Sequence, residues 1–141
     1  MSNPVEHIQK PTIVVSDTDQ RRLTTLATDA LERFPAVAEE LLSEMAQADV
    51  VTAEAVPSNV VQMGSVVAFE ADGGETRRVQ LVFPGKADIG AGRVSILTPI
   101  GAALIGLSQG QSIAWKTRDG RTRRLTVVAV EGAAAAIAAH A

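Results

Sequence analysis

The chain has 141 residues, of which 46% are apolar and 21% charged, a balance that suits one globular unit with a filled core. It contains no cysteine, which excludes disulfides, thiolate zinc sites and cysteine nucleophiles. The N-terminus shows no signal-peptide pattern, and no apolar run approaches the about 20 residues that span a bilayer. We therefore expect a cytoplasmic protein with no membrane partner.

The net charge of −3 is unevenly distributed along the chain. Residues 1–58 carry four basic and ten acidic side chains, whereas residues 59–141 carry nine basic and six acidic ones. This asymmetry has two interpretations: two ordinary solvated surfaces, or an acidic and a basic element that contact different parts of a partner.

After a polar tail over residues 1–10, which we expect to be disordered, the segment 11–48 is predicted to form a strand or extended lead-in and a helical hairpin. Apolar residues recur at three- and four-residue intervals from Asp19 to about Arg33 and from Pro35 to about Ala48. With almost no loop between them, the two helices must fold back as a short antiparallel coiled coil. Its predicted tip comprises Asp29, Glu32, Arg33 and Phe34.

Two acidic residues stand at the start of the first helix. Asp17 with Gln20 has the spacing of a capping box, and Ser16 with Asp19 has a weaker form of it. We interpret Asp17 and Asp19 as helix-starting acids, stabilised by the positive end of the helix dipole. A metal site at this pair is the alternative, but no histidine or further carboxylate stands at the local spacing that such a site needs.

Residues 49–59 are predicted to be a linker, and the pattern then changes to the period of two that is typical of strands. Five short strands are expected between residues 60 and 131. A short helix interrupts them, beginning at Thr98-Pro99, a good N-cap followed by a residue preset for the first helical position, and closed by Gly106. The predicted fold class is α+β, a helical hairpin followed by an antiparallel β domain. Residues 132–141 form an alanine-rich tail to which we assign no function.

Common catalytic signatures are missing from the sequence. Both histidines lie in the tails, there is no tyrosine, and neither a nucleophile elbow, a phosphate-binding loop nor a dinucleotide fingerprint is present. We therefore expect a binding protein with no catalytic residue, no metal and no cofactor.

Arginines gather in the predicted β domain, where strand alternation puts Arg121 and Arg123 on one face. They could be solvated strand edges that prevent aggregation, or a docking patch for an acidic protein surface. Direct nucleic-acid binding is disfavoured, because four aromatic residues supply no stacking platform and the chain is acidic overall.

Three stretches resemble the C-terminal domain of the Gre transcript-cleavage factors: 60–69, 81–88 and, most specifically, Thr98-Pro99-Ile100-Gly101 with the residues up to Gly106. Together with residues 11–15 and the short hairpin, they make the chain similar to the Rnk-type relatives of those factors, the regulators of nucleoside diphosphate kinase. The similarity runs from residue 11 to about residue 131.

This resemblance implies an FKBP-like β domain that binds RNA polymerase at the rim of its secondary channel, and a hairpin that points into the channel. The docking surface it implies contains Leu97, Thr98, Pro99 and Ile100, to which we add Arg121 and Arg123 from their charge. Sequence-specific nucleic-acid contacts are not expected.

The hairpin tip departs from the cleavage factors, whose tips carry adjacent acids that hold a catalytic magnesium. Here Glu32 is followed by a cation and an aromatic residue, and the pair Glu39-Glu40 lies back in the second helix. We therefore expect a non-catalytic regulator that competes with Gre factors. The alternatives are an FKBP-like prolyl isomerase, which the scarcity of aromatic residues disfavours, and a general protein-interaction module.

Overall fold

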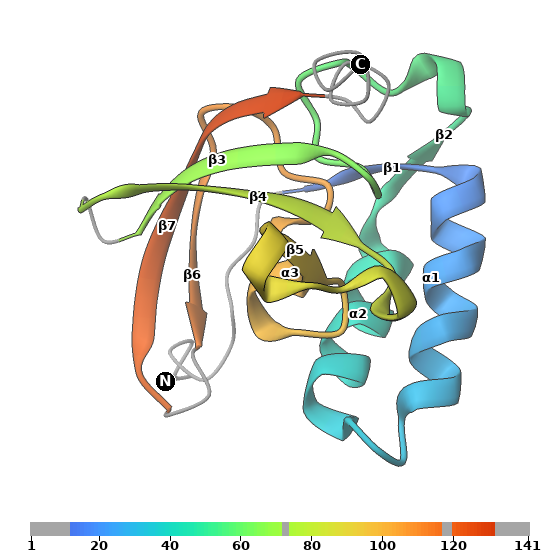
Figure 1. The fold of residues 1–141 in the computed structure, drawn as a ribbon. Coiled ribbons are helices and arrows are strands. Elements are labelled where there is room, and N and C mark those ends of the chain that lie inside the picture. Colours follow the sequence, from blue (N-terminus) through green and yellow to red (C-terminus); the bar gives the residue numbers. More distant parts are fainter. Residues whose placement is uncertain (1–11, 72–73, 117–119, 132–141) are drawn as a thin grey trace, which may run out of the picture.

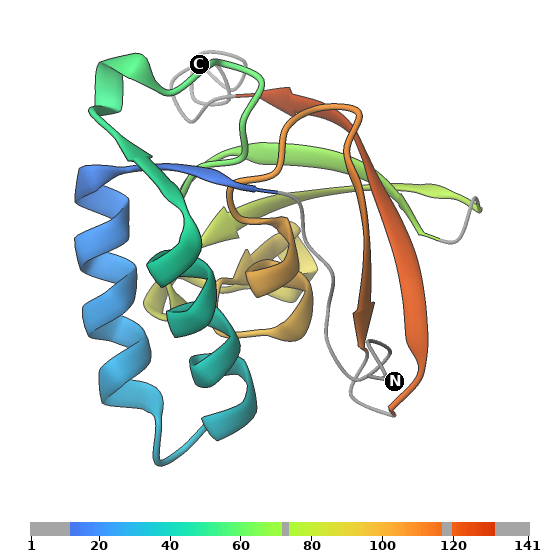
Figure 2. The same ribbon diagram turned by 180° about the vertical axis from the view of Figure 1, so that it is seen from behind.

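The computed structural model describes residues 12–71, 74–116 and 120–131 (Figures 1 and 2). The tails predicted over residues 1–10 and 132–141 lie outside these ranges. Among the described residues, no helix combines the length and the apolar character needed to cross a membrane.

The helical hairpin is present, and its first helix begins two residues earlier than its apolar periodicity indicates. Strand β1 (Val14–Ser16) leads into α1 (Asp17–Ala30), and α2 (Pro35–Gln47) returns beside it. Ser16 is the N-cap, its Oγ accepting a hydrogen bond of 3.0 Å from the Asp19 amide, so the weaker of the two capping patterns is the one that forms. Pro35 occupies the first turn of α2, as predicted.

Residues 49–59, which we expected to be a linker, begin with a strand. Strand β2 (Asp49–Val51) pairs in parallel with β1, and the 3₁₀ turn η2 (Ala53–Ala55) follows it. The Asp49 amide donates to the Ile13 carbonyl at 2.8 Å. The second helix of the hairpin brings the chain back beside β1, so residues 49–51 pair with residues 14–16. The first part of this segment is therefore a strand and not a linker.

The remaining strands form one sheet in the order β5-β4-β3-β7-β6. They are β3 (Val66–Ala71), β4 (Thr76–Val82), β5 (Arg93–Ser95), β6 (Ser112–Lys116) and β7 (Thr122–Glu131). The α+β class is confirmed, but the sheet is mixed rather than wholly antiparallel, because β5 runs parallel to β4.

The parallel pairing of β5 follows from the connection that precedes it. After β4 the chain passes through the 3₁₀ turns η3 (Pro84–Lys86) and η4 (Ile89–Ala91). Asp88 and Arg93 form an antiparallel bridge, so the chain reverses a second time before β5 begins. Two reversals restore the direction of β4, which a simple hairpin would not do. Helix α3 (Pro99–Leu104) then connects β5 to β6.

Hairpin and sheet share a single hydrophobic core. Leu23 and Ala27 of α1 and Leu41 of α2 belong to the same buried cluster as Phe69 of β3 and Leu125 of β7. The hairpin therefore lies against the sheet domain, with α2 facing α3, and its loop end extends beyond α3 (Figures 1 and 2). An arm packed in this way is not a separate folding unit.

Candidate functional site

The start of α3 is held by a compact set of hydrogen bonds. Thr98 Oγ1 accepts from the Gly101 amide at 3.1 Å and donates to the Ser95 carbonyl at 2.7 Å. Ser95 Oγ in turn accepts from the Leu97 amide at 2.9 Å. The Thr98-Pro99 signal of the sequence thus forms the predicted N-cap, and it also ties the helix to the end of β5.

Gly101 permits this close approach between α3 and β5. A Cβ atom at this position would overlap the Ser95 carbonyl oxygen and would lie 2.9 Å from the Ile96 Cα. Both neighbours are backbone atoms, which cannot move aside as a flexible side chain can. The glycine is therefore a steric requirement for presenting the segment that precedes it.

The four predicted docking residues of this segment lie together and are half-buried: Leu97, Thr98, Pro99 and Ile100. Leu97 and Ile100 pack against the core on one side and retain exposed surface on the other. Residues 101–105 behind them are buried. The segment is therefore a partly apolar surface on a fixed backbone, which is a suitable geometry for binding another protein.

The predicted arginines lie elsewhere. Arg121 precedes β7 and is exposed, and Arg123 is half-buried on β7, in register with Trp115 of β6. Figures 1 and 2 show the start of β7, next to Arg121 in the chain, well apart from α3. The two groups of predicted contact residues therefore form two surfaces.

The hairpin tip is exposed at each of its four predicted residues: Asp29, Glu32, Arg33 and Phe34. The Arg33 guanidinium carbon lies 5.7 Å from the centre of the Phe34 ring, a cation–π distance. Phe34 is 46% exposed. Within the described ranges, no group of three or more histidine, aspartate or glutamate side chains is arranged to hold a metal ion.

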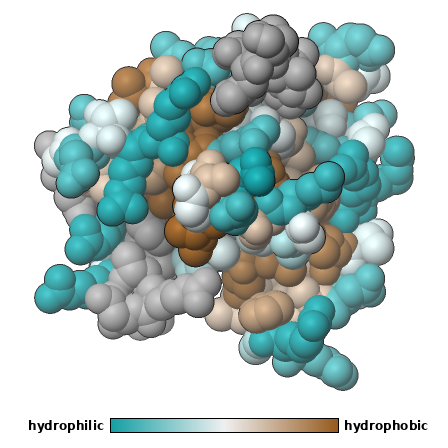
Figure 3. All heavy atoms as spheres, viewed as in Figure 1, coloured by the Kyte–Doolittle hydropathy of each residue, from teal (hydrophilic) through white to brown (hydrophobic). Residues whose placement is uncertain are grey.

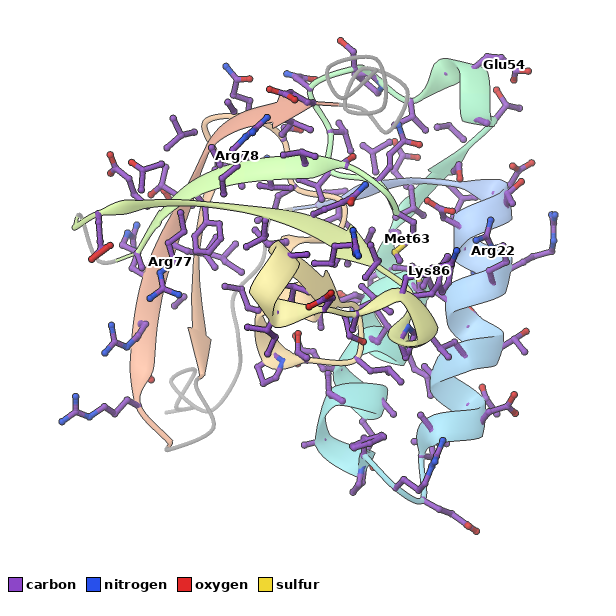
Figure 4. The ribbon with its side chains drawn as sticks, viewed as in Figure 1. Arg22, Glu54, Met63, Arg77, Arg78 and Lys86 are labelled. Atoms are coloured by element: carbon purple, nitrogen blue, oxygen red, sulfur yellow. The ribbon has the colours of Figure 1, made fainter. Side chains whose placement is uncertain are left out.

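Two side chains of α1 join the hairpin to the sheet domain, and sequence reasoning did not find this junction. Asp19 accepts a hydrogen bond of 3.3 Å from the Met63 amide, and the Arg22 guanidinium carbon stands 4.4 Å from the Phe83 ring centre. Figure 4 shows Arg22 on the side of α1 that faces Met63 and Lys86. The only sequence signal is the i, i+3 spacing of Asp19 and Arg22, which puts them on one face of the helix.

Burial of Asp19 has an electrostatic consequence. Desolvation raises the pKa of its carboxyl group, while the Met63 N–H and the Arg22 guanidinium favour the charged form and oppose this rise. Asp19 thus acts as a buried acceptor at the junction as well as a helix-starting acid. The metal-site alternative for Asp17 and Asp19 gains no support, since no suitable cluster of ligands is found among the described residues.

Two family models match the chain. The model described as "Transcription elongation factor, GreA/GreB, C-term" covers residues 56–132, and the Rnk N-terminus model covers residues 11–51. The regulator of nucleoside diphosphate kinase from Escherichia coli (strain K12) is 34% identical over 125 residues, which make up 88% of this chain and 92% of that protein.

Transcription elongation factors are also similar to this chain. GreA of Nitratidesulfovibrio vulgaris is 36% identical over 93 residues, 64% of this chain but 58% of that protein. A GreA/GreB elongation factor structure from Nitrosomonas europaea superimposes with a TM-score of 0.70 at 35% identity, covering 85% of this chain and 99% of that one. The chain therefore belongs to the GreA/GreB family of transcription elongation factors and carries the Rnk-type N-terminus.

Proposed function

We propose that this protein is a non-catalytic transcription regulator that docks on RNA polymerase at the rim of its secondary channel and competes there with Gre factors. The observation that carries the proposal is the start of α3. It displays Leu97 to Ile100 on a backbone fixed by the Thr98 and Ser95 hydrogen bonds, within the region matched by the elongation-factor family model. A surface that is ordered before binding loses less conformational entropy when it docks.

The hairpin supports a regulator without cleavage activity. Its helices have 14 and 13 residues, so the arm is only about 20 Å long at 1.5 Å per residue. Glu32 is followed by Arg33, and a neighbouring guanidinium weakens the attraction of the carboxylate for a cation. Two-metal catalysis needs ions that stabilise both the attacking and the leaving oxygen, which calls for several carboxylate ligands.

The proposal is tested with core RNA polymerase and the full chain. We expect direct binding, full-length transcripts when backtracked complexes are incubated with this protein alone, and slower cleavage when it is added in excess over a cleavage factor. Ile100→Asp should lose both the binding and the competition while it melts close to the wild type. A large fall in its melting temperature would instead assign Ile100 to the core, against which it packs. If the wild-type chain does not bind core polymerase, or shortens transcripts by itself, the proposed function is wrong.

The name of the Escherichia coli relative suggests a cellular readout. We propose that any effect of this chain on nucleoside diphosphate kinase passes through its contact with polymerase. In cells that lack the protein, the wild-type gene should then restore the kinase level, and the gene with Ile100→Asp should not. Equal restoration by both genes would show a route that does not use the docking surface.

A further inference from the structure

Ile89 is the most exposed large apolar side chain among the described residues. It is 88% exposed, whereas Phe34, Val50 and Val128 are between 42% and 46% exposed. It stands at the start of η4, in the loop 84–92 that crosses the face shown in Figure 1. On the same face, Figure 3 shows apolar surface in the middle of the molecule and toward the hairpin, bordered by hydrophilic residues.

The loop that carries Ile89 is rigidly built. The Asp88 amide and carbonyl both bond to Arg93, each at 2.9 Å, and the Asp88 carboxylate accepts from the Ala91 amide at 3.3 Å. The Gly92 carbonyl accepts from the Gln80 amide of β4 at 2.8 Å. Gly92 adopts a left-handed conformation with φ of 78°, which lets the loop close. The isoleucine is therefore displayed on a preformed turn, a geometry that suits an anchor of a protein interface.

The neighbouring sheet edge is closed to strand addition. Strand β5 is at the edge of the sheet, but the Arg93 backbone groups are bonded to Asp88, and the Ser95 carbonyl accepts from Thr98 Oγ1. A partner at this edge must therefore recognise side chains rather than pair with the backbone.

Strand β5 also connects the loop to the start of α3. Its three residues span about 10 Å, with the Ile89 turn before them and Leu97 to Ile100 after them. The Asp88 carboxylate lies 3.7 Å from the Arg93 guanidinium, so opposite charges beside Ile89 are paired within the loop. The exposed apolar side chain of Ile89 is therefore the main feature of this turn that a partner could bind.

We infer that Ile89 is an anchor of the polymerase-docking surface and inserts into an apolar socket on RNA polymerase, next to the contact made by the start of α3. This inference rests on the proposed function and extends the docking surface by a residue that the motif at Thr98 does not contain. The side chain adds little to the core, so a loss of binding on substitution would report the contact itself.

The test compares full-length variants by their affinity for core RNA polymerase and by their melting temperatures. Ile89→Ala should weaken binding about tenfold or more, Ile89→Asp should weaken it further, and Ile89→Leu should retain most of the affinity. All three should melt within a few degrees of the wild type. The matched control is Val128→Ala on β7, another exposed apolar residue, which should leave the affinity unchanged.

The outcomes separate this inference from the proposed function. If Ile100→Asp abolishes binding but Ile89→Asp binds like the wild type, the anchor is wrong and the proposed docking stands. If the wild-type chain does not bind polymerase, both are wrong. A wild-type dimer that Ile89→Asp converts to monomers, with polymerase affinity retained, would assign Ile89 to contact with a second copy and overturn the inference.

Discussion

The start of α3 and the tip of the hairpin both present side chains to solvent, but they are built differently. At the start of α3, Thr98 makes two hydrogen bonds that connect the helix to β5, and Gly101 allows backbone to touch backbone. At the tip, the Arg33 guanidinium lies over the exposed Phe34 ring. A fixed, partly apolar surface favours binding, whereas one acid beside a cation is poor chemistry for holding a metal ion.

The comparison predicts its largest effect at Gly101. Gly101→Ala should lower the free energy of unfolding by about 2–3 kcal/mol, because the new Cβ overlaps backbone atoms of β5, and it should weaken polymerase binding as well. Thermal unfolding and an affinity measurement test this. Gly85→Ala is the matched control, since a Cβ at Gly85 has no neighbour within 4 Å. Equal stability of the two variants would contradict the close approach of α3 to β5.

A smaller effect is expected at the cap. Thr98→Ala removes the acceptor for the Gly101 amide and should cost about 1 kcal/mol of stability. The loss of polymerase affinity should exceed what this destabilisation explains, because Thr98 belongs to the proposed contact surface. Thr98→Ser keeps the hydroxyl group and should retain most of the stability. If the alanine variant bound polymerase normally, the cap would be structural only.

The junction between the two regions should respond to pH. The pKa of Asp19 is raised in the folded chain, so the folded state holds its proton more tightly than the unfolded state, whose aspartate pKa is about 3.9. The Asp19 contribution is therefore most favourable below about pH 4, and stability is lost as pH rises through the folded pKa. Asp19→Asn should flatten this slope and leave the chain at least as stable at pH 7, because the amide oxygen can still accept from Met63. Urea unfolding across about pH 4 to 7 measures it, and an unchanged slope in the variant would count against this assignment.

The smallest effect is expected at the hairpin tip. Glu32→Ala removes an exposed carboxylate and should change stability by less than about 0.5 kcal/mol. It should also leave competition with a cleavage factor unchanged. Loss of an intrinsic transcript-shortening activity in Glu32→Ala would contradict the comparison, because the tip would then be a working catalytic arm.

Patterns of residues close together in the sequence predicted much of the secondary structure. The apolar periodicity and Pro35 placed both helices, and the Thr98-Pro99 pair located the start of α3, because capping and helix initiation depend on residues close in sequence. The resemblance at Thr98 to Gly106 identified the family, which the family models confirm. The docking role of residues 97–100 and of the two arginines stays a prediction.

Other features depended on contacts between distant segments. The helices, most of the strands and the identity of the α3 cap could be predicted, since each rests on a pattern a few residues long. The packing of distant segments, in contrast, sets the parallel direction of β5 beside β4 and the pairing of β2 with β1. It also brings Asp19 to the amide of Met63, 44 residues away. It also decided that Ile89 stands outside the core, because burial depends on which segments cover a residue and not on how apolar that residue is.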